Sequence, residues 1–183
     1  MSDAKRHTIS ALVDNEAGVL SQVSRMFSRK GYNIESLAVG TTADPTVSRM
    51  TIEVIADDHD IELLCNQLGK LIFVRSVKLL DPKKSIRREL VLLKVSTETP
   101  AACDRVIQIA NIFRASIIDV SPTTLTLAII GEESKTDAIV SLVEEFGVLE
   151  LVRTGTVAIE RGTDTIYDAT KERGEFDYGK NVL

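Results

Sequence analysis

Aromatic residues and cysteines are scarce in this chain of 183 residues. Trp is absent, and three Tyr and five Phe offer no aromatic ladder on which nucleic-acid bases could stack. Cys65 and Cys103 fall in helix-like segments, where a free Cys behaves as a small buried apolar residue, so we expect no disulfide. His7 and His59 share no ligand spacing with them, and we therefore expect no structural zinc site.

Long apolar runs and an excess of basic charge are also missing. No run approaches the roughly 18 residues that a membrane-spanning helix needs. The opening MSDAKRHTIS lacks the apolar segment of a secretory signal, so we expect a cytoplasmic protein. A net charge of -5 and a pI near 5.2 argue against nucleic acid, which rewards a basic face. With 44% hydrophobic and 27% charged residues, the chain is expected to be globular.

The spacing of apolar residues predicts six elements in the first half of the chain. Val19, Leu20, Val23, Met26 and Phe27 share one face of a helix that begins near Gly18 and ends at Gly31. A second amphipathic helix is predicted at 60–71. Near-alternating β-branched and apolar residues predict strands at 7–14, 33–40, 47–56 and 72–80. The order β-α-β-β-α-β is that of a ferredoxin-like unit.

The same order is predicted again in the second half. Strands are expected at 88–96, 116–122, 124–131 and 148–161, with helices at 100–115 and 135–147. We therefore predict an α+β protein made of two tandem ferredoxin-like units, which match in architecture rather than in residues.

Composition places the boundaries of these units. The first unit spans 1–82, a linker 83–88, the second unit 89–162 and a polar tail 163–183. The linker carries four basic residues: Lys83, Lys84, Arg87 and Arg88. We expect them to be exposed to solvent in a connecting segment. In the alternative, they contact an acidic surface of a partner. The tail is expected to be flexible, and no helix is assigned to it.

The turn DNEAG, residues 14–18, precedes the first helix and is the candidate binding site. A helix start has about four free N–H groups and a partial positive charge, which attract small anions. Gly18 lets a ligand approach the backbone, and the amide of Asn15 both donates and accepts, which suits the carboxylate and ammonium of an amino acid. In the plainer alternative Asp14 or Asn15 caps the helix and Gly18 eases the turn.

Asn33 follows the same helix, after Gly31. It either serves the turn there or comes near the first turn of a symmetry-related copy. Arg49 in the predicted hairpin TTADPTVSR reads as an exposed residue, with a partner contact as the alternative.

The stretch NEAGVLSQVSRMFSRKGYNIESLAVGTTADPTVSRMTI resembles the N-terminal ACT domain of the small regulatory subunit of acetolactate synthase. The match is close in GYNIESL and DPTVSRMTI. NIFRASIIDVSP and RTGTVAIERG resemble the family's C-terminal domain, so the likeness runs from about Arg6 to Gly162.

The resemblance implies a non-catalytic subunit that forms a homodimer. Such a subunit binds and activates the large catalytic subunit and confers feedback inhibition by branched-chain amino acids, valine above all. A pocket separates side chains that differ by one methylene by only about 1–3 kcal/mol, so the sequence does not rank valine against leucine and isoleucine. Thiamine diphosphate, magnesium and FAD are expected in that catalytic partner, and no cofactor in this chain. Valine is expected at the dimer interface, held at its polar end by Asn15, Gly18 and the backbone of Val19 and Leu20. Asn33 is expected to reach across from the other protomer, and Ile34 to help line the side-chain pocket.

Two other classes of function are weighed against this. An enzyme in its own right is not indicated, because we find no nucleophile–base pair, no paired acids at helical spacing and no phosphate-binding loop. The alternative is a stand-alone ACT-domain amino-acid sensor that regulates transcription or another enzyme. A regulator of transcription would need a DNA-reading element, and no helix is left for one once both units are assigned.

Overall fold

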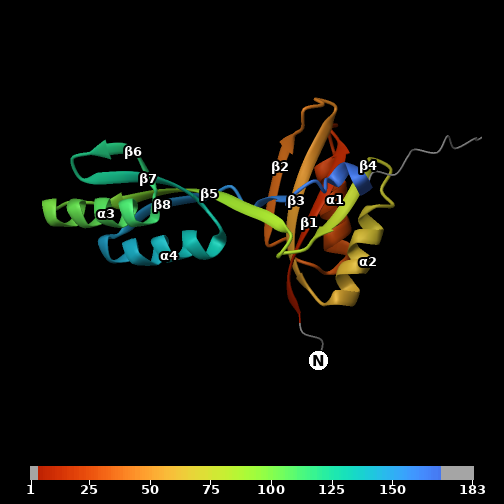
Figure 1. Ribbon diagram of the computed structural model, residues 1–183, viewed down its shortest axis with the longest axis horizontal. Helices are drawn as coiled ribbons and strands as arrows, with labels where there is room; N and C mark the ends of the chain where they lie inside the picture. Colours follow the sequence, from red (N-terminus) through yellow and green to blue (C-terminus); the bar gives the residue numbers. More distant parts are fainter. Residues whose placement is uncertain (1–3, 170–183) are drawn as a thin grey trace, which may run out of the picture.

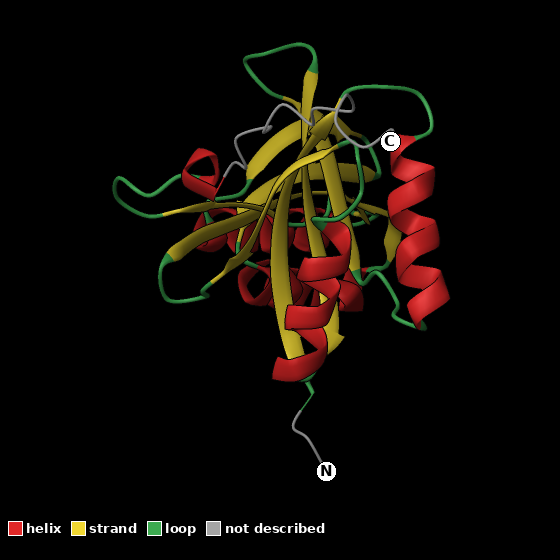
Figure 2. Cartoon of the chain, turned by 90° about the vertical axis from the view of Figure 1, so that its right-hand side faces the viewer, coloured by secondary structure: helices red, strands yellow, loops and turns green. Residues whose placement is uncertain are grey.

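The structure is a computed structural model that describes residues 4–169. It contains two βαββαβ units side by side along the long axis (Figure 1). Seen along that axis, strands fill the middle and helices flank them (Figure 2). The fold class predicted from the sequence, α+β with two tandem ferredoxin-like units, is confirmed. No helix in residues 4–169 is long and apolar enough to cross a membrane.

The N-terminal unit is an antiparallel sheet with the strand order β2-β3-β1-β4. Its elements are β1 (Lys5–Asp14), α1 (Val19–Lys30), β2 (Ser36–Thr41), β3 (Val47–Ala56), α2 (Asp58–Leu68) and β4 (Val74–Leu80). Strand β2 lies at one edge, next to the turn that follows α1.

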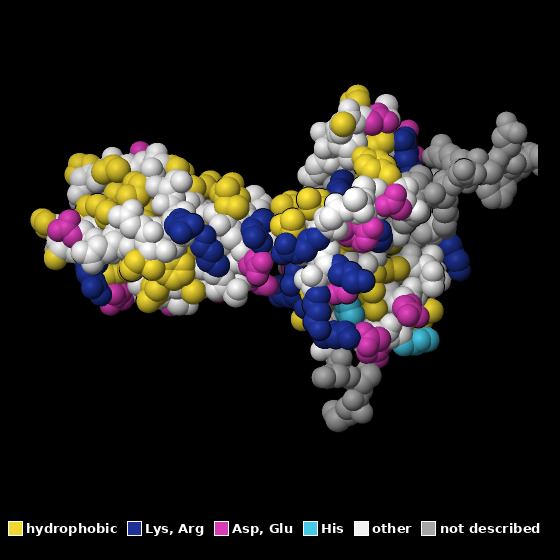
Figure 3. Space-filling model, in the orientation of Figure 1, with side chains coloured by type: hydrophobic (Ala, Val, Ile, Leu, Met, Phe, Trp, Pro, Cys, Tyr) yellow, Lys and Arg dark blue, Asp and Glu magenta, His cyan; other side chains and the backbone are white. Residues whose placement is uncertain are grey.

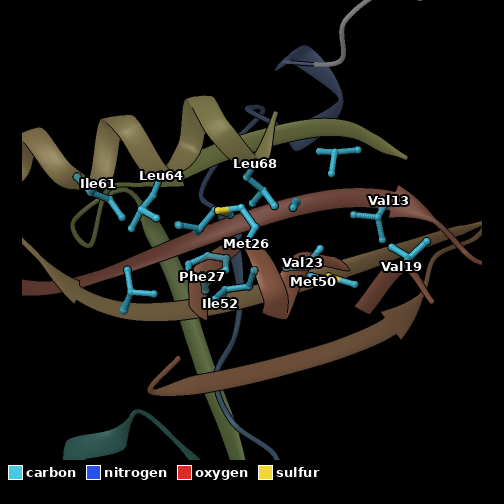
Figure 4. Close-up of a cluster of buried hydrophobic side chains, with 14 of the residues drawn as sticks. Val13, Val19, Val23, Met26, Phe27, Met50, Ile52, Ile61, Leu64 and Leu68 are labelled. Atoms are coloured by element: carbon cyan, nitrogen blue, oxygen red, sulfur yellow. The ribbon is translucent and has the colours of Figure 1, made fainter. Parts of the chain in front are cut away.

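The two helices bury their apolar faces against one side of this sheet. Phe27, Ile52 and Leu64 are fully buried and meet between α1, α2 and the strands (Figure 4). The side chains of β1 and β3 alternate, so Ile9 and Ile52 face this core while Ser10 and Arg49 face the other side of the sheet. Leu20, expected on the buried face of α1, is 44% exposed.

The C-terminal unit repeats the topology with the order β6-β7-β5-β8. Its elements are β5 (Ser85–Ser96), α3 (Pro100–Phe113), β6 (Ser116–Ser121), β7 (Thr124–Gly131), α4 (Glu133–Val143), a 3-10 turn η1 (Glu144–Phe146) and β8 (Val148–Arg153). Val91, Leu93 and Val95 of the central strand face the core beneath α3 and α4.

The chain then returns from the C-terminal unit to the N-terminal one. The region 148–161, predicted as one strand, divides into β8 and β9 (Val157–Glu160). Residues 85–88, expected in a solvated linker, lie in β5 and pair with β9, and Ser85 is buried. Residues 166–169, expected to lack structure, form a 3-10 turn η2 (Ile166–Ala169). The rest of the predicted tail, 170–183, lies outside the described residues.

This returning segment covers the back of the N-terminal sheet. Arg49 donates to Ser10 Oγ at 3.0 Å and to the main-chain carbonyl of Ala158 at 2.9 Å. Ile166 is buried against Leu12 and Val47, and its carbonyl accepts the Ser76 hydroxyl at 2.9 Å. Arg49 is therefore half-buried, and the expectation of an exposed hairpin arginine is wrong. Burial lowers the pKa of Arg49 from its ordinary value.

Candidate functional site

The start of helix α1 is open. Gly18 is the N-cap residue, with a φ of 89°, and no side chain caps the helix. A Cβ placed at Gly18 would meet nothing within 4 Å. Gly18, rather than Asp14 or Asn15, therefore occupies the N-cap position. A left-handed glycine with open space above it leaves the positive end of the helix accessible to an anion.

Asn15 lies beside this helix start and is held by the loop between β2 and β3 and by the first residues of β3. Its Nδ2 donates to the carbonyl of Pro45 at 2.9 Å, and its Oδ1 accepts the hydroxyl of Ser48 at 3.1 Å. Its main-chain N–H donates to Thr46 O at 2.8 Å. The side chain is exposed, so these bonds orient an amide that solvent and solutes can still reach.

Arg75 of strand β4 braces the same region. Its Nε donates to Asp14 Oδ1 at 2.6 Å, and its Nη1 lies 3.9 Å from Asp44 Oδ2. Asp44 also accepts the main-chain N–H and the hydroxyl of Thr46 at 2.9 and 2.7 Å. The hydrogen bonds from Thr46 lower the pKa of Asp44, with a smaller contribution from the charge of Arg75.

Val19 and Leu20, the two residues after Gly18, contribute to the site in different ways: Val19 through its backbone and Leu20 through its side chain. The side chain of Val19 is buried in the core, so only its backbone faces the site, and its N–H makes a long 3.4 Å bond to Glu16 O. Leu20 projects outward and supplies apolar surface near the helix start. The structure thus brings Asn15, Gly18, Val19 and Leu20 together.

Asn33 and Ile34 lie at the other end of α1. The helix has 12 residues, about 18 Å, so one chain does not place Asn33 next to Asn15. Asn33 is exposed and donates to Glu35 Oε1 at 2.8 Å, while Ile34 is half-buried against the core. Edge strand β2 follows them directly and pairs on one side only, with β3, among the described strands.

A second polar cluster joins the two units. Arg6 Nη1 lies 2.6 Å from Glu133 Oε2 and 3.4 Å from Glu53 Oε2, and Glu53 accepts the hydroxyls of Thr8 and Thr156 at 3.3 and 3.2 Å. Burial lowers the pKa of Arg6, but the hydrogen bond and charge of Glu133 and the charge of Glu53 raise it overall. Lys and Arg side chains gather where the units meet (Figure 3).

This junction is tightly packed around Gly155, and a cavity of about 300 Å³ lies beside it, lined by Arg6, Glu53 and Glu133 among others. A Cβ at Gly155 would stand 2.7 Å from Ser36 Oγ and 3.2 Å from Leu37 O, so only glycine fits there. The Thr156 N–H donates to Ser36 Oγ at 2.9 Å. We read the cluster as the structural joint between the units.

Sequence reasoning missed two groups at the α1 site: Ser48 and Arg75. Ser48 stands opposite Val13 in the β1–β3 register, which puts it close to the end of β1. That register could be anticipated from the hairpin. The contact of Arg75 with Asp14 at the end of β1 could not, because the register between β1 and β4 shifts between Leu12 and Val13 and no sequence pattern marks this shift.

Two family models match the chain. Residues 9–76 match the AHAS small subunit-like ACT domain, and residues 88–162 match the small subunit of acetolactate synthase. Together the two matches span most of the chain and follow the two units of the fold.

Individual relatives agree with these models. The chain is 43% identical over 160 residues to the probable acetolactate synthase small subunit of Methanothermobacter thermautotrophicus, covering 87% of this chain and 95% of the relative. It is 45% identical over 157 residues to the acetolactate synthase small subunit of Aquifex aeolicus, covering 86% and 82%.

A solved structure has the same arrangement. The crystal structure of the acetolactate synthase small subunit from Thermotoga maritima matches with a TM-score of 0.82 and 37% identity, covering 87% of this chain and 99% of that one. Sequence, family models and fold therefore agree that this chain belongs to the family of acetolactate synthase small subunits.

Proposed function

We propose that the chain is the regulatory, non-catalytic subunit of acetolactate synthase. It binds the large catalytic subunit, raises its activity and confers feedback inhibition by valine. Thiamine diphosphate, magnesium and FAD belong to the catalytic partner in this proposal. The observation that carries it is the uncapped start of α1, with open space at Gly18 and the oriented amide of Asn15 beside it, in a member of this family.

The chemistry of this site fits a small zwitterion. A carboxylate would meet the N–H groups of the helix start, and charge-assisted hydrogen bonds contribute about 1.5–3 kcal/mol each. The helix end adds about 0.3–1 kcal/mol and a buried side chain of valine size about 1.5–3 kcal/mol. After the costs of ordering, binding falls between millimolar and micromolar, a range suited to sensing a metabolite pool.

The site is completed by a second copy of the chain. Edge strand β2 leaves one row of backbone groups free to pair with another strand, and Asn33 and Ile34 lie immediately before it. A two-fold pairing along β2 gives each protomer a neighbour whose Asn33 and Ile34 meet the helix start. Valine then bridges the protomers and favours the dimer state in which its pocket is tighter.

Regulation follows from that linkage. A difference of about 1–3 kcal/mol in valine affinity between two states of the dimer is enough to change the activity of a bound partner. By reciprocity, the catalytic subunit changes the affinity for valine by the same factor.

A mixing experiment tests the shared site. Asn15→Ala and Asn33→Ala homodimers should each bind valine weakly in titration calorimetry. In a re-equilibrated equimolar mixture, half of the dimers are mixed, and each has one site with both asparagines. About a quarter of all sites should then regain the wild-type affinity. No recovery on mixing would show that the two residues do not share a site.

A capture experiment tests the partner. The full chain, immobilised and exposed to host extract, should retain a thiamine-diphosphate enzyme. Retention of DNA instead would support a transcriptional sensor.

A further inference from the structure

The loop between β2 and β3 is tied together by its own hydrogen bonds. Thr42 donates its hydroxyl to Asp44 O at 3.0 Å, and Asp44 binds Thr46 through its carboxylate. Two further main-chain bonds close its base, from Thr42 N to Val47 O at 2.9 Å and from Val47 N to Asp44 O at 3.0 Å. Residues 42–46, here called the hairpin loop, therefore present Pro45 O and the adjacent Ser48 in a defined position.

Those two groups fix the orientation of the Asn15 amide. A carbonyl oxygen only accepts hydrogen bonds, so Nδ2 of Asn15 must face Pro45 and Oδ1 must face the Ser48 hydroxyl. Each end of the amide then keeps one unused position, an N–H on Nδ2 and a lone pair on Oδ1. This pair matches the carboxylate and the ammonium of an amino acid.

We propose that Ser48 and the carbonyl of Pro45 are positioning groups of the amino-acid site, and that ligand binding at Asn15 in turn steadies the hairpin loop. The inference rests on the function proposed above and identifies the groups that orient the Asn15 amide. The ligand, Asn15 and the hairpin loop form one chain of hydrogen bonds, so ordering at one end favours ordering at the other.

Arg75 supports this coupling by a second route. It binds Asp14, which directly precedes Asn15, and approaches Asp44 in the hairpin loop. The segment before α1 and the hairpin loop are thus joined both through Asn15 and through Arg75. Movement of one segment requires adjustment of the other.

The test compares Ser48→Ala with two further variants. Titration calorimetry with L-valine on the full chain should give binding weaker by roughly two- to tenfold in Ser48→Ala, the loss of one hydrogen bond. Ser48→Thr keeps the hydroxyl and should restore most of the affinity. Ser76→Ala is the matched control, because Ser76 is also buried in this sheet and its hydroxyl donates to Ile166 O, away from Asn15.

Hydrogen exchange supplies the second readout. Valine should slow the exchange of the amides of Thr42 and Thr46 in the wild-type chain, and should slow it less in Ser48→Ala at equal occupancy of the site. A purely structural role for Ser48 would lower stability without changing this response to valine.

The outcomes separate the two proposals. Valine binding that is unchanged in Ser48→Ala, or reduced equally in Ser76→Ala, overturns the positioning role and leaves the site standing. If valine binds but does not change the hydrogen exchange of the hairpin-loop amides, the proposed coupling between the ligand and the hairpin loop is overturned. No binding of valine to the wild-type chain overturns both this inference and the proposed function.

Discussion

Arg49, near the start of strand β3, donates a hydrogen bond at 2.9 Å to the main-chain carbonyl of Ala158, which lies 109 positions further along the chain. The same guanidinium binds Ser10 on the neighbouring strand. One side chain therefore joins the N-terminal sheet to the segment that returns from the C-terminal unit. The N-terminal unit is finished by residues that follow the second unit in sequence.

Replacing Arg49 should loosen this joint. Arg49→Met removes two hydrogen bonds from a charged donor and should lower the free energy of unfolding by about 2 kcal/mol. Arg49→Lys keeps the charge but not the planar fork, so it should recover little of the loss. Urea unfolding followed by circular dichroism measures both, and a Lys variant as stable as wild type would contradict the geometric role.

Ile166 should contribute to stability by burial. It is 3% exposed against Leu12 and Val47, so Ile166→Ala should cost about 2 kcal/mol. The neighbouring Tyr167 is 59% exposed, and Tyr167→Ala should change stability by no more than about 0.5 kcal/mol. Equal effects in the same urea titration would mean that η2 does not dock as described.

At Gly18 the backbone complicates the obvious substitution. With φ at 89°, any other residue is strained by about 1–2 kcal/mol, although its Cβ has open space. Gly18→Asp and Gly18→Asn share this strain and differ in charge. Gly18→Asp should therefore bind valine at least roughly tenfold more weakly than Gly18→Asn, through repulsion of the ligand carboxylate. Calorimetric affinities that are the same in both variants would remove the carboxylate from this helix end.

The hairpin loop should depend on pH through Asp44. Its pKa lies below the ordinary value of 3.8 because Thr46 donates two hydrogen bonds to the carboxylate. A lowered folded pKa means that the ionised group stabilises the loop above the unfolded pKa. That contribution is lost as the pH falls through the folded pKa.

A carboxyl NMR titration measures this pKa directly. Thr46→Val removes the hydroxyl donor and keeps the main-chain one, so the pKa of Asp44 should rise part of the way toward 3.8. An unchanged midpoint would show that the hydroxyl contact does not matter in solution.

Much of the fold could be predicted because its signals are local. The 3.6-residue spacing of Val19, Val23 and Phe27 defines α1, and Gly31 ends it in the left-handed conformation. The β-α-β-β-α-β order follows from elements read one at a time.

The segment that returns to the N-terminal unit could not be predicted, because its contacts are with residues distant in sequence. Strand β9 has four residues, and its pairing with β5 joins Arg88 to Val157 across the whole second unit. Arg49 reads as an exposed hairpin residue because its carbonyl partner is distant in sequence. Leu20 is expected on the apolar face of α1, but it is 44% exposed, whereas its neighbour Val19 is buried in the core.

The candidate site also has a part that could be predicted from local sequence and a part that could not. Asn15 and Gly18 could be chosen from the sequence because they directly precede the apolar period of α1 and because the family resemblance assigns them to the ligand. The supports of Asn15 could not, since Pro45 acts through a main-chain atom and Ser48 through a hydroxyl on another strand.

The docking of β9 and η2 on the back of the N-terminal sheet also bears on how the protein is made. The hydroxyl of Ser76 donates to the carbonyl of Ile166, which follows 90 positions later in the chain. The carboxylate of Glu53 accepts the hydroxyl of Thr156, which follows 103 positions later. During translation the contacts on this face of the first unit can form only after the second unit, through residue 166, has emerged from the ribosome. Completion of the N-terminal unit would thus follow synthesis of the C-terminal unit, although the N-terminal unit is made first.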